Sequence, residues 1–222
     1  MVEESMNAPI LHYMTGPAGQ IEVASLGCDI TQAMPERALL VLHPHPLHGG
    51  TMGNKVVTTI ARAAKESELA VVAFNFRGAG QSEGVWDDGV GELQDAVAVA
   101  QKMIDQGVEI LSVAGFSFGA SMAARLLNVI KAQFPDIKMQ SLTQIAPAIV
   151  NFPVTDADLG DVPTVVLFNA DDEVVDPGAM QAYVERFSLP HVIHPEGGHF
   201  FHGRLTRLKA DLLLHWQRLG WL

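Results

Sequence analysis

Residues 110–132 read ILSVAGFSFGASMAARLLNVIKA, and this stretch decides the fold class. Its first part, 110–114, is a short apolar run that predicts a buried strand. Its last part, 120–132, is rich in Ala and Leu and predicts a helix. The pattern Gly-x-Ser-x-Gly lies between the two and is centred on Ser117. This succession of strand, small-residue turn and helix is typical of a turn that projects a serine hydroxyl above a sheet.

The same pattern occurs a second time in Gly80-Gln81-Ser82-Glu83-Gly84. With glycine at about 7% of residues, chance produces such a match in about one chain of this length in ten. The predicted strand before the second copy ends at Phe76, and residues 85–89 after it predict a loop instead of a helix. We therefore expect Ser82 to cap a turn and Ser117 to be the reactive serine, with a simple helix N-cap as the alternative for Ser117.

Outside this stretch, apolar runs alternate with helical patterns along the chain. Strands are predicted at 21–26, 38–43, 70–76, 140–149, 163–169 and 191–194, with 10–14 as a candidate partner of the first. Helices are predicted at 54–65, 91–105, 178–187 and 204–218. Continuous apolar strands between amphipathic helices indicate an α/β fold, with a mostly parallel sheet covered by helices on both faces. No repeat or linker interrupts the pattern, so we expect one domain over residues 1–222, with its site at the carboxyl ends of the strands.

The charge and the cysteine content indicate the kind of partner and compartment. The chain has 48% hydrophobic residues, and its 14 Lys and Arg against 25 Asp and Glu give a net charge of −11. So acidic a protein is poorly suited to bind nucleic acid or an anionic membrane. Cys28 is the only cysteine, the start of the chain lacks a basic and apolar leader, and no apolar stretch approaches the ~20 residues that span a bilayer. We therefore expect a cytoplasmic protein that acts on a small molecule without a cofactor.

A reactive serine needs a base to take its proton, and that base needs an orienting carboxylate. In folds with such a turn, the acid and then the histidine follow the serine along the chain. Candidates for the acid are Asp171, Asp172, Glu173 and Asp176. Candidates for the base are His191, His194, His199 and His202. His199 follows two glycines in a loop before the last predicted helix, so we expect it to be the base, with His202 as the alternative.

The loop after strand 38–43 reads HPHPLHGG. A carbonyl under attack develops a negative oxygen that two backbone N–H groups must stabilise. The first donor is expected from Phe118, directly after the serine. The second is expected from this loop, where the two prolines have no N–H and leave His45 and Leu47 as candidates. We favour His45, because the flanking prolines stiffen its backbone.

The histidines of this loop also suggest a different class of site. The spacing of His43, His45 and His48 could bind a catalytic zinc ion. The two prolines interrupt the strand that would align these side chains, and no carboxylate accompanies them. We therefore expect no metal and keep a metallohydrolase as an alternative. A non-catalytic protein that only binds a ligand or partner is a further alternative, although such a protein needs none of the candidate catalytic residues.

Five segments, taken in order between residues 8 and 220, resemble a known group of proteins. They are HPHPLHGGTMGNKVV, FNFRGAGQSEG, GFSFGA, NADDEVVDP and GGHFFHGRL. They resemble the small bacterial predicted hydrolases of the α/β superfamily and, more distantly, the dienelactone hydrolases, which carry cysteine where this chain has Ser117. The resemblance implies an α/β-hydrolase fold and a Ser117-Asp172-His199 triad. Asp172 fits an Asp-x-x-Val segment, which Asp171 also fits one residue earlier.

The mechanism that these residues support is hydrolysis of small carboxylic esters or related acyl bonds. Residues 150–162, between two predicted strands, number only 13 and show no helical stripe. A lid of two helices would need roughly twice that length. We therefore expect an open site without a lid. Candidates for its apolar lining are Phe116, Phe118, Phe152 and Phe200, with core packing as the alternative for each.

Overall fold

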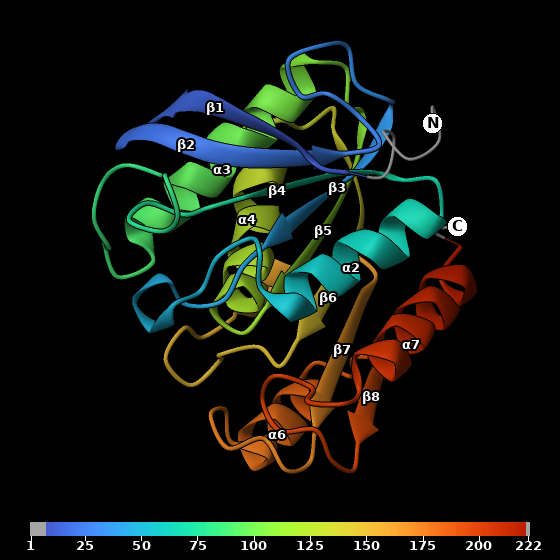
Figure 1. Cartoon of the computed structure of the whole chain (residues 1–222). Coiled ribbons are helices and arrows are strands. Elements are labelled where there is room, and N and C mark those ends of the chain that lie inside the picture. The colour runs from blue at the N-terminus through green and yellow to red at the C-terminus, as the bar shows by residue number, and fades with distance from the viewer. Residues whose placement is uncertain (1–7, 221–222) are drawn as a thin grey trace.

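The structure is a computed structural model that describes residues 8–220. Its strands are β1 (Ile10–Gly16), β2 (Gly19–Leu26), β3 (Arg37–Leu42), β4 (Ala70–Phe74), β5 (Ile110–Phe116), β6 (Lys138–Ile145), β7 (Thr164–Asn169) and β8 (His191–His194). Within the described residues they form one sheet in the order β1-β2-β4-β3-β5-β6-β7-β8 (Figure 1). The hairpin of β1 and β2 is antiparallel, β2 is antiparallel to β4, and every other neighbouring pair is parallel.

Helices cover both faces of this sheet. They are η1 (Pro46–His48), α2 (Lys55–Glu66), α3 (Val90–Asp105), α4 (Phe118–Gln133), α5 (Asp156–Leu159), α6 (Pro177–Arg186) and α7 (Leu205–Arg218). Figure 1 shows α2 and α7 side by side on one face, with α3 and α4 on the other. The predicted α/β-hydrolase fold, with a mostly parallel sheet and helices on both faces, is confirmed.

Two inner strands, β4 and β7, are buried along their whole length. All residues of β4 (AVVAF) and β7 (TVVLFN) are buried, whereas β1 at the edge alternates between exposed and half-buried positions. A strand covered by helices on both faces has to be apolar on both faces, which explains the continuous apolar runs. The core thus fixes the strands, and the loops at their carboxyl ends rest on a rigid base.

The segment after β6 differs from its predicted form. The strand predicted over 140–149 begins two residues earlier and ends at Ile145, because Ala146 adopts a positive φ of 41° that breaks the extended backbone. The sequence also missed α5, a helix of only four residues. Since α5 is the only helix between β6 and β7 in the described chain, the expectation of no lid is confirmed. No helix among residues 8–220 has the length and apolar character needed to cross a bilayer.

Candidate active site

Ser117 joins β5 to α4 at the carboxyl edge of the sheet. Its backbone has φ 55° and ψ −119°, a conformation that costs a non-glycine residue on the order of 1–3 kcal/mol. The N–H of Ser117 donates to the carbonyl of Ile145 at 2.8 Å, and its own carbonyl accepts the N–H of Ala148 at 3.2 Å. The end of β6 and the turn after it therefore hold the strained backbone in place.

The two glycines that flank Ser117 permit close backbone approach. A Cβ on Gly115 would lie 2.2 Å from the carbonyl oxygen of Gly119. A Cβ on Gly119 would lie 2.4 Å from the carbonyl oxygens of Leu42 and His43, at the end of β3. Any larger residue would push α4 away from β3. This contact brings the first turn of α4 against the loop that follows β3.

His199 and Asp172 form a buried pair beside this turn. The Nδ1 atom of His199 lies 2.8 Å from Oδ2 of Asp172, and both side chains are at most 2% exposed. The other carboxylate oxygen of Asp172 accepts the N–H groups of Val174 at 2.9 Å and Val175 at 2.8 Å. An ionised carboxylate only accepts hydrogen bonds, so Nδ1 of His199 donates and its Nε2 keeps a free lone pair. The ring of Phe116, next to Ser117, packs on the imidazole with centroids 4.8 Å apart.

Three other side chains near the end of β7 hold the loop that carries His199. The carboxylate of Asp171 accepts the N–H of Gly198 at 2.9 Å and that of the preceding glycine at 3.0 Å. These two hydrogen bonds lower the pKa of Asp171 below its usual value. Glu173 accepts the backbone N–H of His199 at 3.0 Å, and the amide of Asn169 donates to the carbonyl of Gly198 at 2.6 Å. Asp171 therefore positions the loop, while its neighbour in sequence contacts the imidazole.

The other candidate histidines lie elsewhere. His202 is exposed in the turn before α7. Nε2 of His194 lies 2.9 Å from the carboxylate of Asp211 on α7, and exposed His191 contacts the carbonyl of Leu189. Of the candidate bases, His199 is the one that the structure brings to a carboxylate beside the Ser117 turn.

The loop after β3 lies next to the Ser117 turn. Among residues 8–220, neither the N–H of His45 nor that of Phe118 has a hydrogen-bond acceptor. The N–H of Leu47 instead donates to Nδ1 of the His45 ring at 3.3 Å. The rings of His45 and Phe118 lie 5.3 Å apart, so the two residues are neighbours across the site. Of the two loop candidates, His45 keeps an unused N–H.

His43 has a structural place in the same loop. Its Nε2 accepts the N–H of Phe76 at 2.9 Å, so its Nδ1 carries the proton and donates to the carbonyl of Pro44 at 2.6 Å. Burial lowers the pKa of His43 to about 4. Because both ring nitrogens are engaged, His43 has no lone pair for a metal ion. No group of three or more potential ligands in the described part of the chain could hold one.

Aromatic side chains lie on two sides of Ser117. Phe116 is buried and contacts Phe200, which is 41% exposed, on the side of His199. Phe118 contacts Phe152 at 4.8 Å and Trp86 at 5.1 Å on the other side. Trp86 could not be predicted as part of the site, since no local sequence pattern links the loop after β4 to these rings.

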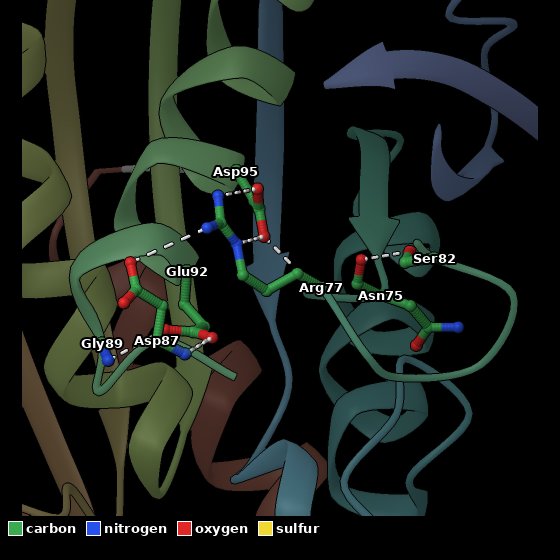
Figure 2. Close-up of polar contacts among 7 residues, drawn as sticks. All are labelled: Asn75, Arg77, Ser82, Asp87, Gly89, Glu92 and Asp95. Atoms are coloured by element: carbon green, nitrogen blue, oxygen red, sulfur yellow. Dashed lines mark hydrogen bonds and ion pairs between the residues drawn. The ribbon is translucent and has the colours of Figure 1, made fainter. Parts of the chain in front are cut away.

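Ser82, in the second Gly-x-Ser-x-Gly pattern, is buried in a turn. Its hydroxyl donates to the carbonyl of Asn75 at 2.6 Å and accepts the N–H of Glu22 at 3.0 Å (Figure 2 shows the first of these bonds). The hydroxyl thus ties the turn to β2 and to the end of β4.

Comparison with known proteins identifies the class to which this fold and site belong. A model of the family described as serine hydrolase (FSH1) matches residues 61–202. XC6422 from Xanthomonas campestris, an α/β serine hydrolase described as having no lid, is 35% identical with a TM-score of 0.81, and the match covers 97% of this chain and 95% of that one. The chain therefore belongs to the FSH1 family of serine hydrolases.

Two further relatives agree with this assignment. An α/β serine hydrolase homologue from Coxiella burnetii is 35% identical with a TM-score of 0.79, and the match covers 94% of this chain and 97% of that one. The protein RP471 from Rickettsia prowazekii (strain Madrid E) is 40% identical over 118 residues, which is 52% of this chain and 48% of RP471. The matched part thus spans about half the length of that curated relative.

Proposed function

We propose that this serine hydrolase cleaves small carboxylic esters, with Ser117 as nucleophile, His199 as base and Asp172 as the acid that orients it. The buried hydrogen bond of 2.8 Å between His199 and Asp172 carries the proposal. A structural histidine needs no free Nε2 beside a strained serine turn. A base that activates a serine needs both a free Nε2 and a serine beside it.

The reaction follows from these positions. Nε2 of His199 takes the hydroxyl proton of Ser117 while Oγ bonds to the ester carbonyl carbon. The carbonyl oxygen becomes an oxyanion and accepts the unused N–H groups of Phe118 and His45. His199 then gives its proton to the departing alcohol, which leaves an acyl group on Ser117. Water, deprotonated by His199, attacks this acyl-enzyme and releases the acid.

Asp172 acts through His199. It holds the proton on Nδ1, which leaves Nε2 free to accept, and it stabilises the imidazolium that forms when Ser117 attacks. The two backbone N–H groups on its other oxygen, from Val174 and Val175, hold the carboxylate in place. The pair is therefore ready before substrate arrives.

The absence of a lid between β6 and β7 supports small soluble esters over lipid aggregates. An apolar cover that opens at a lipid surface is the usual basis of interfacial activation, and in the described chain the only helix in that place is α5, with four residues. Thioesters and peptide-like acyl bonds would follow the same chemistry. Carboxylic esters are the class that we propose.

The test is a rate series on p-nitrophenyl esters from acetate to palmitate, below and above the solubility limit of each. We expect saturable turnover of soluble short esters and labelling of Ser117 by a fluorophosphonate probe. A sharp rise in rate when a long-chain ester forms an interface would contradict an open site. A protein that neither turns over any ester nor takes the probe would instead be a binding protein.

A further inference from the structure

Four aromatic rings close one side of the site. His45, Trp86, Phe118 and Phe152 are here called the aromatic cluster. Every pair among them is in contact, with centroid distances from 4.2 Å between His45 and Trp86 to 6.1 Å between Trp86 and Phe152. Phe118 is fully buried beneath the other three, which are half-buried. The cluster is therefore a packed group with no gap between its members.

The sheet order places this cluster opposite the base. His45 follows β3 and Trp86 follows β4, whereas His199 follows β8 at the far edge. Ser117 follows β5, which lies between these strands in the sheet. In the tetrahedral intermediate the departing alcohol has to face His199, because His199 protonates it. The oxyanion faces the N–H groups of Phe118 and His45. The remaining substituent, the acyl group, is directed away from His199 and toward the aromatic cluster.

The aromatic cluster restricts the room on its own side of the site. On the acyl side, the rings of the aromatic cluster pack against one another at van der Waals separation. Trp86 is its largest member, and it comes from a loop instead of the core. The size of the acyl group is therefore limited by how firmly this loop holds Trp86.

Backbone hydrogen bonds fix the loop around Trp86 (Figure 2). Glu92 on α3 is fully buried and accepts the N–H of Asp87 at 3.0 Å and that of Gly89 at 2.8 Å. The indole N–H of Trp86 donates to the carboxylate of Asp88 at 3.0 Å. Both the backbone and the ring of Trp86 thus have defined positions.

A buried ion pair holds the other end of the same loop. The guanidinium of Arg77 makes two hydrogen bonds with the carboxylate of Asp95, at 2.8 and 3.0 Å, and the backbone N–H of Arg77 donates to that carboxylate at 3.0 Å (Figure 2). A Cβ on Gly91 would lie 1.9 Å from Nη1 of Arg77, so α3 packs directly on the guanidinium. The loop is anchored at both ends, and Trp86 between them is a fixed stop.

We propose that Trp86 sets the upper limit on acyl-chain length and restricts the enzyme to esters of short-chain acids such as acetate and butanoate. This inference rests on the proposed function, because it needs an acyl group on Ser117. Removal of the indole opens a space behind the stop, into which a longer chain fits. The prediction is a gain of activity, which general damage to the protein does not produce.

The experiment compares kcat/KM for p-nitrophenyl octanoate and acetate, both below their solubility limits. The Trp86→Ala variant is expected to raise the octanoate-to-acetate ratio about tenfold or more over the natural protein. Trp86→Phe, which keeps a smaller ring, should give an intermediate ratio. Val85→Ala is the matched control: it shortens an exposed side chain next to Trp86 in the same loop, and its octanoate-to-acetate ratio should stay that of the natural protein.

The outcomes separate this inference from the proposed function. An unchanged ratio in folded Trp86→Ala overturns the role of Trp86 while the esterase activity stands, and so does a natural protein that prefers octanoate. If Trp86→Ala does not fold, Trp86→Phe and Trp86→Leu carry the same comparison. A natural protein that hydrolyses neither ester contradicts the proposed function itself, and with it the assignment of an acyl side.

Discussion

The two Gly-x-Ser-x-Gly segments share a pattern and differ in which residue carries the positive φ. In the first, Ser117 itself has φ 55°, and its flanking glycines serve close packing of backbone against backbone. In the second, the glycines carry it, with φ 55° at Gly80 and 89° at Gly84. The pattern alone thus requires only small residues in a tight turn. The element that follows, α4 in one case and a loop in the other, decides which residue is strained.

The two serine hydroxyls differ accordingly. The hydroxyl of Ser82 is used by the backbone of Asn75 and Glu22, so it contributes to the stability of the turn. Ser117 is held through its backbone N–H and carbonyl, by Ile145 and Ala148. One serine stabilises the fold through its side chain, and the other is positioned so that its side chain stays available.

The largest difference between the two segments should appear in turnover. Ser117→Ala is expected to lower kcat by on the order of 10⁵-fold or more, since removing the nucleophile leaves only binding and the oxyanion donors. Ser82→Ala should keep kcat within a few-fold. The measurement is hydrolysis of p-nitrophenyl acetate together with fluorophosphonate labelling. Labelling of the Ser117→Ala protein would show that the reactive serine lies elsewhere.

The next effect tests whether the first segment alone is coupled to a base. Asp172→Asn is expected to lower kcat by on the order of 10³- to 10⁴-fold, because an amide can hold the imidazole in the wrong tautomer. Asp171→Asn is the matched control, since its carboxylate accepts N–H groups from the His199 loop and does not touch the ring. Asp171→Asn should lower kcat far less than Asp172→Asn does. If Asp171→Asn is the inactive variant, the assignment of the acid is off by one residue.

Local features of the site followed from the sequence. β5, Ser117 and α4 are contiguous, so a short apolar run, a small-residue turn and an Ala-rich helix define them without reference to the rest of the chain. The alternation of apolar runs and helical patterns likewise gave the mostly parallel sheet. The end of β6 was missed although the sequence marks it: Pro147 follows Ala146, and a proline cannot donate to the ladder of a central strand.

Features that depend on distant contacts could not be derived in this way. Asp171 and Asp172 fit the same local pattern, and only the position of the His199 loop shows that their carboxylates diverge. The resemblance to a family favoured Asp172 without giving that reason. Trp86 contacts His45 on one side of the site although α2 and β4 separate the two in the sequence, and no periodicity predicts such a contact.

In contrast to turnover, the free energy of unfolding should fall more in Ser82→Ala than in Ser117→Ala. Ser82→Ala leaves the buried N–H of Glu22 without an acceptor, which costs on the order of 1–3 kcal/mol of unfolding free energy. Ser117→Ala should change that free energy by only a few tenths of a kcal/mol, since it keeps the backbone hydrogen bonds of the turn. Urea unfolding of the two variants measures both values. Equal losses would mean that the hydroxyl of Ser117 also stabilises the fold.

The last expected effect concerns His43, which joins the two regions. Its carbonyl lies against Gly119 of the first segment, and its Nε2 accepts the N–H of Phe76, just before the second. Burial lowers the folded-state pKa of His43 to about 4, whereas the unfolded chain titrates near its usual value of 6.5. The unfolded state therefore binds a proton first as the pH falls. The stability that neutral His43 provides is complete above pH 6.5 and is lost progressively between about pH 6.5 and 4, at a slope of at most about 1.4 kcal/mol per pH unit.

The control for this effect is His43→Gln, whose amide oxygen can accept the Phe76 N–H but does not titrate. The substitution itself can change the unfolding free energy at neutral pH. The comparison is therefore between the slopes of unfolding free energy against pH, and not between the values at one pH. Urea unfolding at intervals from pH 7 to pH 4 should give a steeper loss of stability for the natural protein than for His43→Gln, since the other histidines contribute equally to both. Identical slopes would mean that His43 accepts a proton in the folded protein as readily as in the unfolded chain, and that the link between the two segments does not depend on its neutral form.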